Sequence, residues 1–181
     1  MILQITKGEK VELKDAILGR RSIRRFTDKE IPREVLEEIL ETGIWAPTAS
    51  NSQVWIFIAV TDPAMLKKIR TVSPGMFWTA KAVICIGFDK KKAEQYFGSG
   101  NYRLPHYDCG MAAQNMMLRA YDLGLGSCVM ASFDDQAVGN LLSVPEHIKI
   151  ELLLMLGYYT QTPKVPARNE NVIHFEKFKQ R

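Results

Sequence analysis

The sequence predicts one folded domain that mixes helices and strands. Its 181 residues suit a single domain and allow a sizeable core. Apolar residues make up 46% of the chain, and no long polar tract separates them. Segments with helical apolar spacing alternate with short apolar runs typical of buried strands, without any internal repeat. We therefore expect residues 1–181 to form one domain, with residues 163–181 as an extended C-terminal arm.

The spacing of apolar residues and the capping signals place the elements. The expected helices cover residues 13–18, 32–43, 63–69 and 110–123, with one more after Asp134 or Asp135, and the expected strands cover residues 54–60, 82–88, 128–133 and 148–156. Gly19 follows the first helix as a stop signal, and Pro32 suits the first turn of the second. Asp62 and Pro63 form an N-cap and first-turn pair for the third helix.

Two segments lie outside this pattern. Residues 89–107 are charged, then rich in glycine and aromatic residues, which predicts a partly mobile cover; the alternative is a solvated loop between a strand and the central helix. Beyond Gly157 the chain contains Pro163 and Pro166 and has little material for a core of its own. We expect this arm to pack on something else, such as a second subunit.

Composition excludes several classes of protein. The net charge of +4 favours anionic ligands only weakly. Apolar runs such as residues 152–156 are far too short to cross a bilayer, and residues 1–10 lack the order of a signal peptide. The three cysteines, Cys85, Cys109 and Cys128, lie in apolar surroundings and indicate reduced core residues of a cytoplasmic protein.

The loop at residues 46–55 is a candidate ligand site. Its amides Asn51 and Gln53 lie two residues apart, on one face of an extended chain, and Trp55 follows at the start of a strand. Such a loop could line a site for a flat ligand with a polar edge. An ordinary helix-to-strand connection is the alternative.

The basic segment at residues 20–26 is the second candidate. In an extended chain Arg20, Ser22 and Arg24 point the same way, and two guanidiniums beside a hydroxyl suit a phosphate. The alternatives are a solvated basic turn or an ion-pair surface for the acidic helix at residues 32–43. A nucleic-acid site is disfavoured, because no basic helix or aromatic ladder accompanies the segment.

No side chain stands out as the chemical actor. A phosphate-binding P-loop is absent, and residues 124–129 lack the third glycine of a dinucleotide fingerprint. The histidines (His106, His147 and His174) show no metal-ligand spacing, and Cys109 near His106 has no orienting third group. This favours a bound cofactor as the source of the chemistry.

Taken together, the ordered motifs resemble the FMN-dependent nitroreductase family. They are Arg20-Arg21-Ser22-Ile23-Arg24 with Phe26, the loop Ala46-Pro47-Thr48-Ala49-Ser50-Asn51-Ser52-Gln53 with Trp55, the helix from Asp108 that ends in Gly124-Leu125-Gly126-Ser127-Cys128, and residues 163–168. The resemblance covers about residues 11–170. It implies an α+β fold, with a central, mostly antiparallel sheet flanked by helices, and an intertwined homodimer with two FMN sites at its interface.

The resemblance also assigns cofactor-binding roles. Arg20, Ser22 and Arg168 would hold the FMN phosphate, Arg21 would contribute mainly its backbone, and Arg24 would lie near the ribityl chain or the pyrimidine edge. The residues that would line the flavin, some from the partner subunit, are Pro47, Thr48, Ala49, Asn51 and Gln53.

A backbone amide that faces the flavin N5 in the family corresponds here to Ala131 or Ser132. The sequence departs from the family pattern at Val54, Val129 and Ala131. The contact that the family makes before the second strand would have to come from residues 72–75.

The implied function is an FMN oxidoreductase that takes hydride from NADH or NADPH. A small electron-poor acceptor, such as a nitroaromatic or quinone, would then use the same face, which implies ping-pong kinetics. Tyr96, Phe97 and Tyr102 of the cover would contact this planar substrate. The alternatives are another reaction on the same fold, such as reductive dehalogenation or flavin breakdown, and a flavin-binding module with little turnover.

Overall fold

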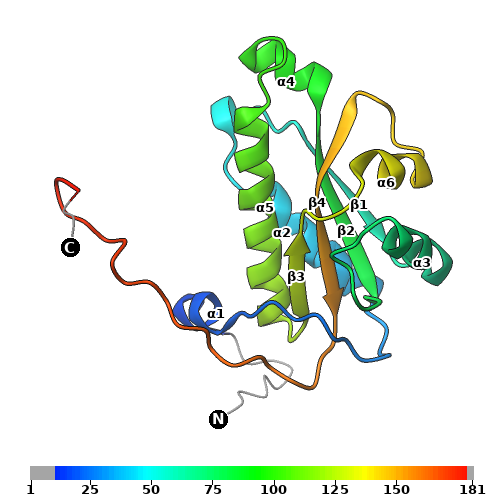
Figure 1. The fold of residues 1–181 in the computed structure, drawn as a ribbon, viewed down its shortest axis with the longest axis vertical. Helices are drawn as coiled ribbons and strands as arrows, with labels where there is room; N and C mark the ends of the chain where they lie inside the picture. The colour runs from blue at the N-terminus through cyan, green and yellow to red at the C-terminus, as the bar shows by residue number, and fades with distance from the viewer. Residues whose placement is uncertain (1–10, 179–181) are drawn as a thin grey trace.

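The computed structural model describes residues 11–178, and its elements follow the predicted order (Figure 1). They are α1 (Leu13–Gly19), α2 (Arg33–Ile44), the 3-10 turn η1 (Ala49–Asn51), β1 (Trp55–Val60), α3 (Pro63–Thr71), β2 (Ala82–Asp89), α4 (Lys90–Phe97), α5 (Arg103–Asp122), β3 (Gly126–Met130), α6 (Asp135–Leu141) and β4 (Ile148–Gly157). Residues 1–10, where a signal peptide was not expected, and the last three residues of the predicted arm lie outside the described residues.

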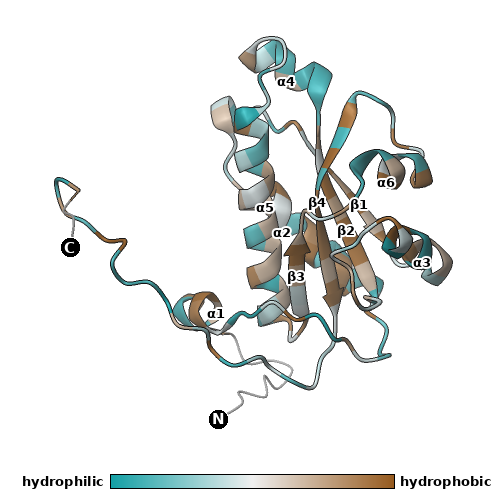
Figure 2. Cartoon of the chain, viewed as in Figure 1, coloured by the Kyte–Doolittle hydropathy of each residue, from teal (hydrophilic) through white to brown (hydrophobic). Residues whose placement is uncertain are grey.

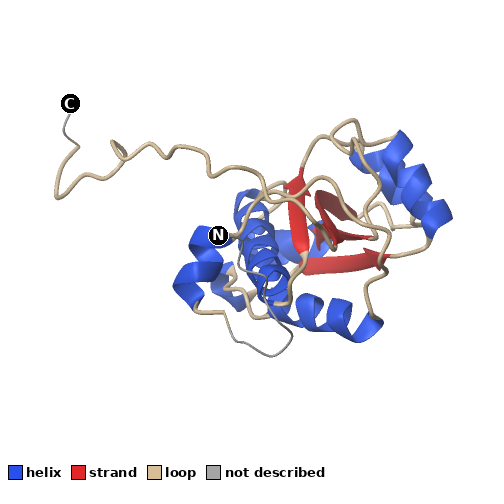
Figure 3. Ribbon diagram, turned by 90° about the horizontal axis from the view of Figure 1, so that it is seen from below, coloured by secondary structure: helices blue, strands red, loops and turns tan. Residues whose placement is uncertain are grey.

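A four-stranded sheet in the order β1-β2-β4-β3 forms the centre, and every neighbouring pair is antiparallel. Helices cover both of its faces, as the view from below shows (Figure 3). This confirms the predicted α+β fold with a mostly antiparallel sheet. At the edge formed by β3, Ser22 adds a single parallel bridge to Ser127, so the basic segment runs beside the sheet.

The core consists of two apolar clusters, one on each face of the sheet. Ile84 and Ile86 of β2 point into a cluster with α2 and α5, whereas Val83 and Cys85 point into one with α3 and α6. All eight residues of β2 are therefore buried. Burial on both faces explains why the strand is a continuous apolar run in the sequence (Figure 2).

Two predicted helix caps are confirmed. The Asp62 carboxylate accepts a hydrogen bond from the Met65 N–H at 2.8 Å, and Pro63 occupies the first turn. Asp134, rather than Asp135, caps α6 by accepting from the Ala137 N–H at 2.9 Å. Each bond satisfies an N–H that the helix itself leaves unpaired.

The expected cover at residues 89–107 contains helical structure that the sequence did not predict. The segment contains helix α4, which Asp89 caps by accepting from the Lys92 N–H at 3.0 Å, and α5 already begins at Arg103. Gly98, with φ at 87°, ends α4. Lysine, alanine, glutamate and glutamine are good helix formers, so the charged run is a solvated helix rather than a loop.

After β4 the chain has no helix or strand as far as residue 178. Residues 160–173 are all exposed, and this stretch runs away from the sheet (Figure 1). Among residues 11–178, no helix combines the length and apolar character needed to cross a membrane.

Candidate functional site

The basic segment is fixed against the edge of β3. The Ile23 N–H donates to the Ser127 carbonyl at 2.9 Å, and the Ile23 side chain is buried. A Cβ atom at Gly126 would lie 2.7 Å from the Ile23 Cβ, which is closer than such atoms approach. Gly126 is therefore required for this packing.

Three side chains of this segment, Arg20, Ser22 and Arg24, act on the same thiol. Burial raises the pKa of the Cys128 thiol, while Arg24, a hydrogen bond from Ser22 and Arg20 act in the opposite direction. All three groups therefore lie close enough to this buried thiol to affect its pKa, as expected for side chains on a common face. Arg25 points elsewhere, with its guanidinium carbon 4.9 Å from the centre of the Trp78 ring.

Within residues 11–178, the charges of Arg20, Arg21 and Arg24 are not neutralised by an ion pair. Arg21 donates to the carbonyls of Leu18 at 2.6 Å and Arg20 at 2.8 Å, which fixes it at the end of α1. The Nε atoms of Arg20 and Arg21 and the hydroxyl of Ser127 are buried without a hydrogen-bond partner in the part of the chain that the structure describes.

The predicted alternative of an ion-pair surface for the acidic helix is wrong. Two of the acids on α2 are engaged elsewhere: Glu37 pairs with Arg33 at 2.7 Å, and Glu38 pairs with Arg119. Between residues 11 and 178, no arginine of the basic segment forms a salt bridge with α2. An anion with several oxygens suits these unpaired donors.

The loop at residues 47–53 is a compact turn, not the extended chain that the spacing of its amides predicted. Ser50, Asn51 and Gln53 have φ values of 54°, 50° and 47°, in the left-handed region. Even so, the two amides lie together, because Gln53 Nε2 donates to Asn51 Oδ1 at 3.0 Å. The backbone N–H of Gln53 also donates a hydrogen bond to the Thr48 hydroxyl at 3.3 Å. Pro47 precedes the turn and is exposed.

Asp108 connects this turn to α5, a role for Asp108 that the sequence did not predict. Its side chain is buried, and Oδ1 accepts from the Ala49 N–H at 3.2 Å. Oδ2 has no hydrogen-bond partner within residues 11–178. Burial raises the pKa of the Asp108 carboxyl, and the bond from Ala49 partly opposes this. The sequence feature that could have identified Asp108 is a carboxylate, next to Cys109, on the apolar side of the central helix.

The segment after β3 lies against residues 72–75. The Gly75 N–H donates to the Ser132 carbonyl at 3.1 Å, and the Asp134 N–H donates to the Val72 carbonyl at 2.9 Å. Ala131 and Ser132 are exposed. The structure thus brings together the segment that the resemblance placed near the flavin N5 and the segment that would have to supply the contact before the second strand.

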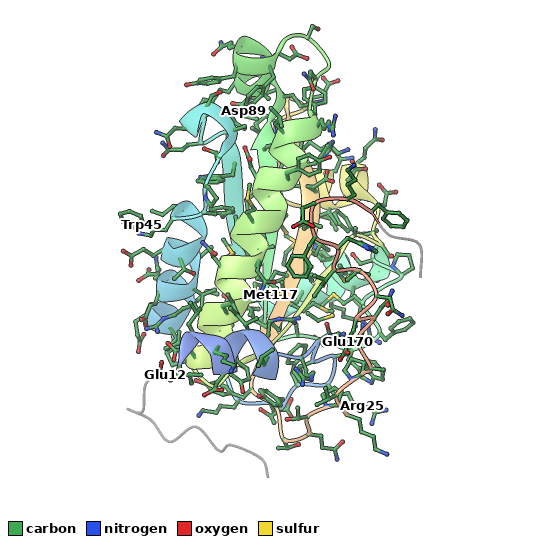
Figure 4. All side chains as sticks on the ribbon, turned by 90° about the vertical axis from the view of Figure 1, so that its left-hand side faces the viewer. Glu12, Arg25, Trp45, Asp89, Met117 and Glu170 are labelled. Carbon is green, nitrogen blue, oxygen red and sulfur yellow. The ribbon has the colours of Figure 1, made fainter. Side chains whose placement is uncertain are left out.

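One chain does not bring the basic segment and the amide turn together. Gly19, next to the basic segment, abuts Tyr121, whereas the turn is attached at Asp108. These contacts are 13 positions apart on α5, or about 20 Å at 1.5 Å per residue. Figure 4 shows the same separation, with Arg25 at one end of the molecule and the turn after Trp45 toward the other. Arg168 is exposed on the arm.

Two of the three predicted substrate aromatics pack inward. Phe97 and Tyr102 border the cluster that includes Phe88, and the Tyr102 ring centre lies 5.6 Å from that of Phe88. The Tyr102 hydroxyl also donates to the Glu94 carboxylate. Tyr96 remains 55% exposed, with its ring 5.9 Å from that of Phe97. Internal packing accounts for Phe97 and Tyr102, so only Tyr96 presents a free face.

The histidines and cysteines show no catalytic arrangement in residues 11–178, where no cluster suited to a metal occurs. His106 packs edge-on against Phe88 at 5.3 Å, and its Nδ1 lies 3.0 Å from a Glu151 carboxylate oxygen. Burial raises the pKa of the Cys109 thiol to about 12, which disfavours a nucleophilic thiolate. All three cysteines are free and buried, as predicted.

Comparison with known proteins agrees with this architecture. The model of the nitroreductase family matches residues 17–73 and 64–158. A Methanothermobacter thermautotrophicus protein, provisionally named as an NADH dehydrogenase/NAD(P)H nitroreductase, is 32% identical over 95% of this chain and 91% of its own. The NADPH-flavin oxidoreductase of Vibrio harveyi is 27% identical over 85% of this chain and 68% of its own.

A solved structure extends the match to three dimensions. The FMN-dependent nitroreductase of Clostridium difficile superimposes with a TM-score of 0.79 at 26% identity, over 91% of this chain and 99% of that one. The motifs that suggested the family therefore occur on its fold. The chain belongs to the nitroreductase family.

Proposed function

We propose that this protein is an FMN-dependent oxidoreductase that uses NADH or NADPH as electron donor. The observation that carries the proposal is the convergence of Arg20, Ser22 and Arg24 beside β3 without an acidic partner among the described residues. A phosphate dianion would receive charge-assisted hydrogen bonds from these groups. The unpaired buried Nε atom of Arg20 fits such a ligand.

The remaining residues fit the ring of the cofactor. Pro47, Thr48, Ala49, Asn51 and Gln53 would line it, with the paired amides of Asn51 and Gln53 offering both donors and acceptors. The backbone N–H of Ala131 or Ser132 would face the N5 atom. When bound, FMN accepts hydride from the nicotinamide and passes electrons to an acceptor. The protein's part is to bind and orient, since none of its described side chains is placed as an acid or base.

We also infer that the working unit is a homodimer. The two groups of cofactor residues are about 20 Å apart along α5 in one chain, so a second copy would supply the missing group. Leu13, Trp45 and Leu118 border a groove of about 420 Å³, and Trp45 is 78% exposed. Such apolar surface is typical of obligate interfaces. The exposed arm could then deliver Arg168 to a phosphate site.

The acceptor is proposed to be a small electron-poor molecule, such as a nitroaromatic or a quinone. Donor and acceptor would occupy the same face in turn, which gives ping-pong kinetics. Among Tyr96, Phe97 and Tyr102, the Tyr96 side chain is the most exposed and is therefore best placed to contact a planar substrate. The free, buried cysteines support a reducing compartment such as the cytoplasm.

An absorbance spectrum and anaerobic reduction test the proposal. The purified protein should be yellow, and added NADH or NADPH should bleach the flavin band when oxygen is absent. A nitroaromatic or quinone should then restore the band. Colourless protein that binds no added FMN would overturn the cofactor assignment, and a yellow protein that neither nucleotide bleaches would be a flavin-binding module instead.

A further inference from the structure

The amide turn is held in a conformation that its residues do not favour. Ser50, Asn51 and Gln53 all have positive φ within four positions, and none of them is glycine. Residues in sparsely populated backbone regions cost about 1–3 kcal/mol each, so the surroundings must hold them in place. Inside the turn, the bonds from Gln53 to Thr48 and Asn51 contribute, but they do not orient the turn relative to the body of the protein.

A buried carboxyl provides that external attachment. The N–H of Ala49, at the start of η1, donates to Asp108 Oδ1 at 3.2 Å, and Asp108 is only 2% exposed. The second oxygen of Asp108 has no partner within residues 11–178, as is also true of the buried Ser52 hydroxyl in the same turn. Burial of an unpaired polar oxygen is unfavourable, by about 1–3 kcal/mol. The bond from Ala49 accounts for one oxygen of Asp108 but not for the cost of burying the second, whereas a site that needs the turn in one orientation gives a reason for the carboxyl.

We propose that Asp108 is a positioning residue for the flavin ring, which it serves through the Ala49 N–H and the orientation of the amide turn. The inference rests on the proposed FMN function. Asp108 itself is not proposed to touch the cofactor, and its effect should be confined to the ring end of the site. The phosphate end, at Arg20 and Ser22, should be unaffected.

Two substitutions separate positioning from mere stability. In Asp108→Leu, a larger apolar side chain with the same branching replaces the buried carboxyl and leaves the Ala49 N–H without its acceptor, so the apoprotein should remain folded but melt somewhat below the wild-type temperature. Without the acceptor for Ala49, affinity for both FMN and riboflavin should fall about ten-fold. Asp108→Asn retains an acceptor oxygen and should bind both ligands within about three-fold of wild type.

The control is Asp62, at the start of α3. Its carboxylate also accepts a backbone N–H, from Met65 at 2.8 Å, but away from the amide turn and from the apolar groove. Asp62→Asn and Asp62→Leu should leave both flavin affinities unchanged. Riboflavin is the informative ligand because it lacks the phosphate: a defect at the ring end weakens both ligands equally.

The outcomes are distinct. A wild-type protein that binds no flavin refutes the proposed function, whatever the variants do. If the wild type binds flavin and a folded Asp108→Leu variant binds it with the same affinity, the positioning role is wrong. A loss confined to FMN, or an Asp108→Asn variant as weak as Asp108→Leu, overturns it as well. If Asp108→Leu fails to fold, the carboxyl is a stability element and the inference is likewise wrong.

Discussion

Replacing Arg20 by alanine should weaken FMN binding specifically at the phosphate. Arg20 is half-buried, and its buried Nε has no partner among residues 11–178, so it is free to engage an anion. A lost charge-assisted hydrogen bond costs about 1.5–3 kcal/mol. This corresponds to roughly a ten- to hundred-fold rise in the dissociation constant.

The chain offers a matched control in Arg25, five positions away. Arg25 carries the same charge, but its guanidinium stacks on Trp78, and Arg25 is not among the groups that affect the Cys128 thiol. Arg25→Ala therefore removes the same net charge and should change FMN affinity by less than about three-fold, as expected for screened charge alone. Arg168→Ala should match Arg20→Ala if the arm of a second copy reaches the phosphate.

Quenching of flavin fluorescence measures these affinities on the apoproteins at one fixed ionic strength. Riboflavin should bind wild type and Arg20→Ala equally, because it has no phosphate for Arg20 to hold. Equal FMN affinity in wild type and Arg20→Ala would refute the phosphate assignment. Equal losses in Arg20→Ala and Arg25→Ala would show that net charge, and not the geometry beside β3, is responsible.

Other predictions concern the fold, the arm, the former cover and the thiols. Gly87→Ala should destabilise the protein by about 2–3 kcal/mol in denaturant titration, because its Cβ would lie 2.1 Å from a backbone oxygen of β4. Gly110→Ala, which meets nothing within 4 Å on α5, should be neutral or stabilising. Truncation after Tyr159 should lower both dimer content and bound FMN in sedimentation runs; a stable, fully yellow dimer would contradict the role of the arm. Phe97→Ala should lower the melting temperature through lost packing, rather than alter the Michaelis constants for several acceptors selectively. Cys85, whose pKa burial raises to about 12, should resist thiol reagents at pH 8 until the protein unfolds; rapid labelling of the native protein would be inconsistent with this burial.

Features governed by local rules were predictable from the sequence. The run at residues 82–88 became a strand buried on both faces, since period-two alternation sends its side chains into two separate clusters. Asp62 caps α3, because a cap depends only on the next three residues. The common face of Arg20 and Ser22 follows from the same alternation, once the segment is extended beside β3.

Other features depended on contacts between distant parts of the chain. The compact form of the amide turn depends on Asp108, 59 positions after Ala49, and no local pattern links the two. The inward packing of Tyr102 depends on Phe88 from the central strand. The length of α5 separates Arg20 from Gln53, a distance that the sequence alone did not reveal. Local propensity and periodicity thus determined the elements and the faces of their side chains. Tertiary packing decided which polar groups were satisfied, which remained unpaired, and how far apart the two halves of the site lie, because burial and hydrogen bonding depend on which segments meet in space.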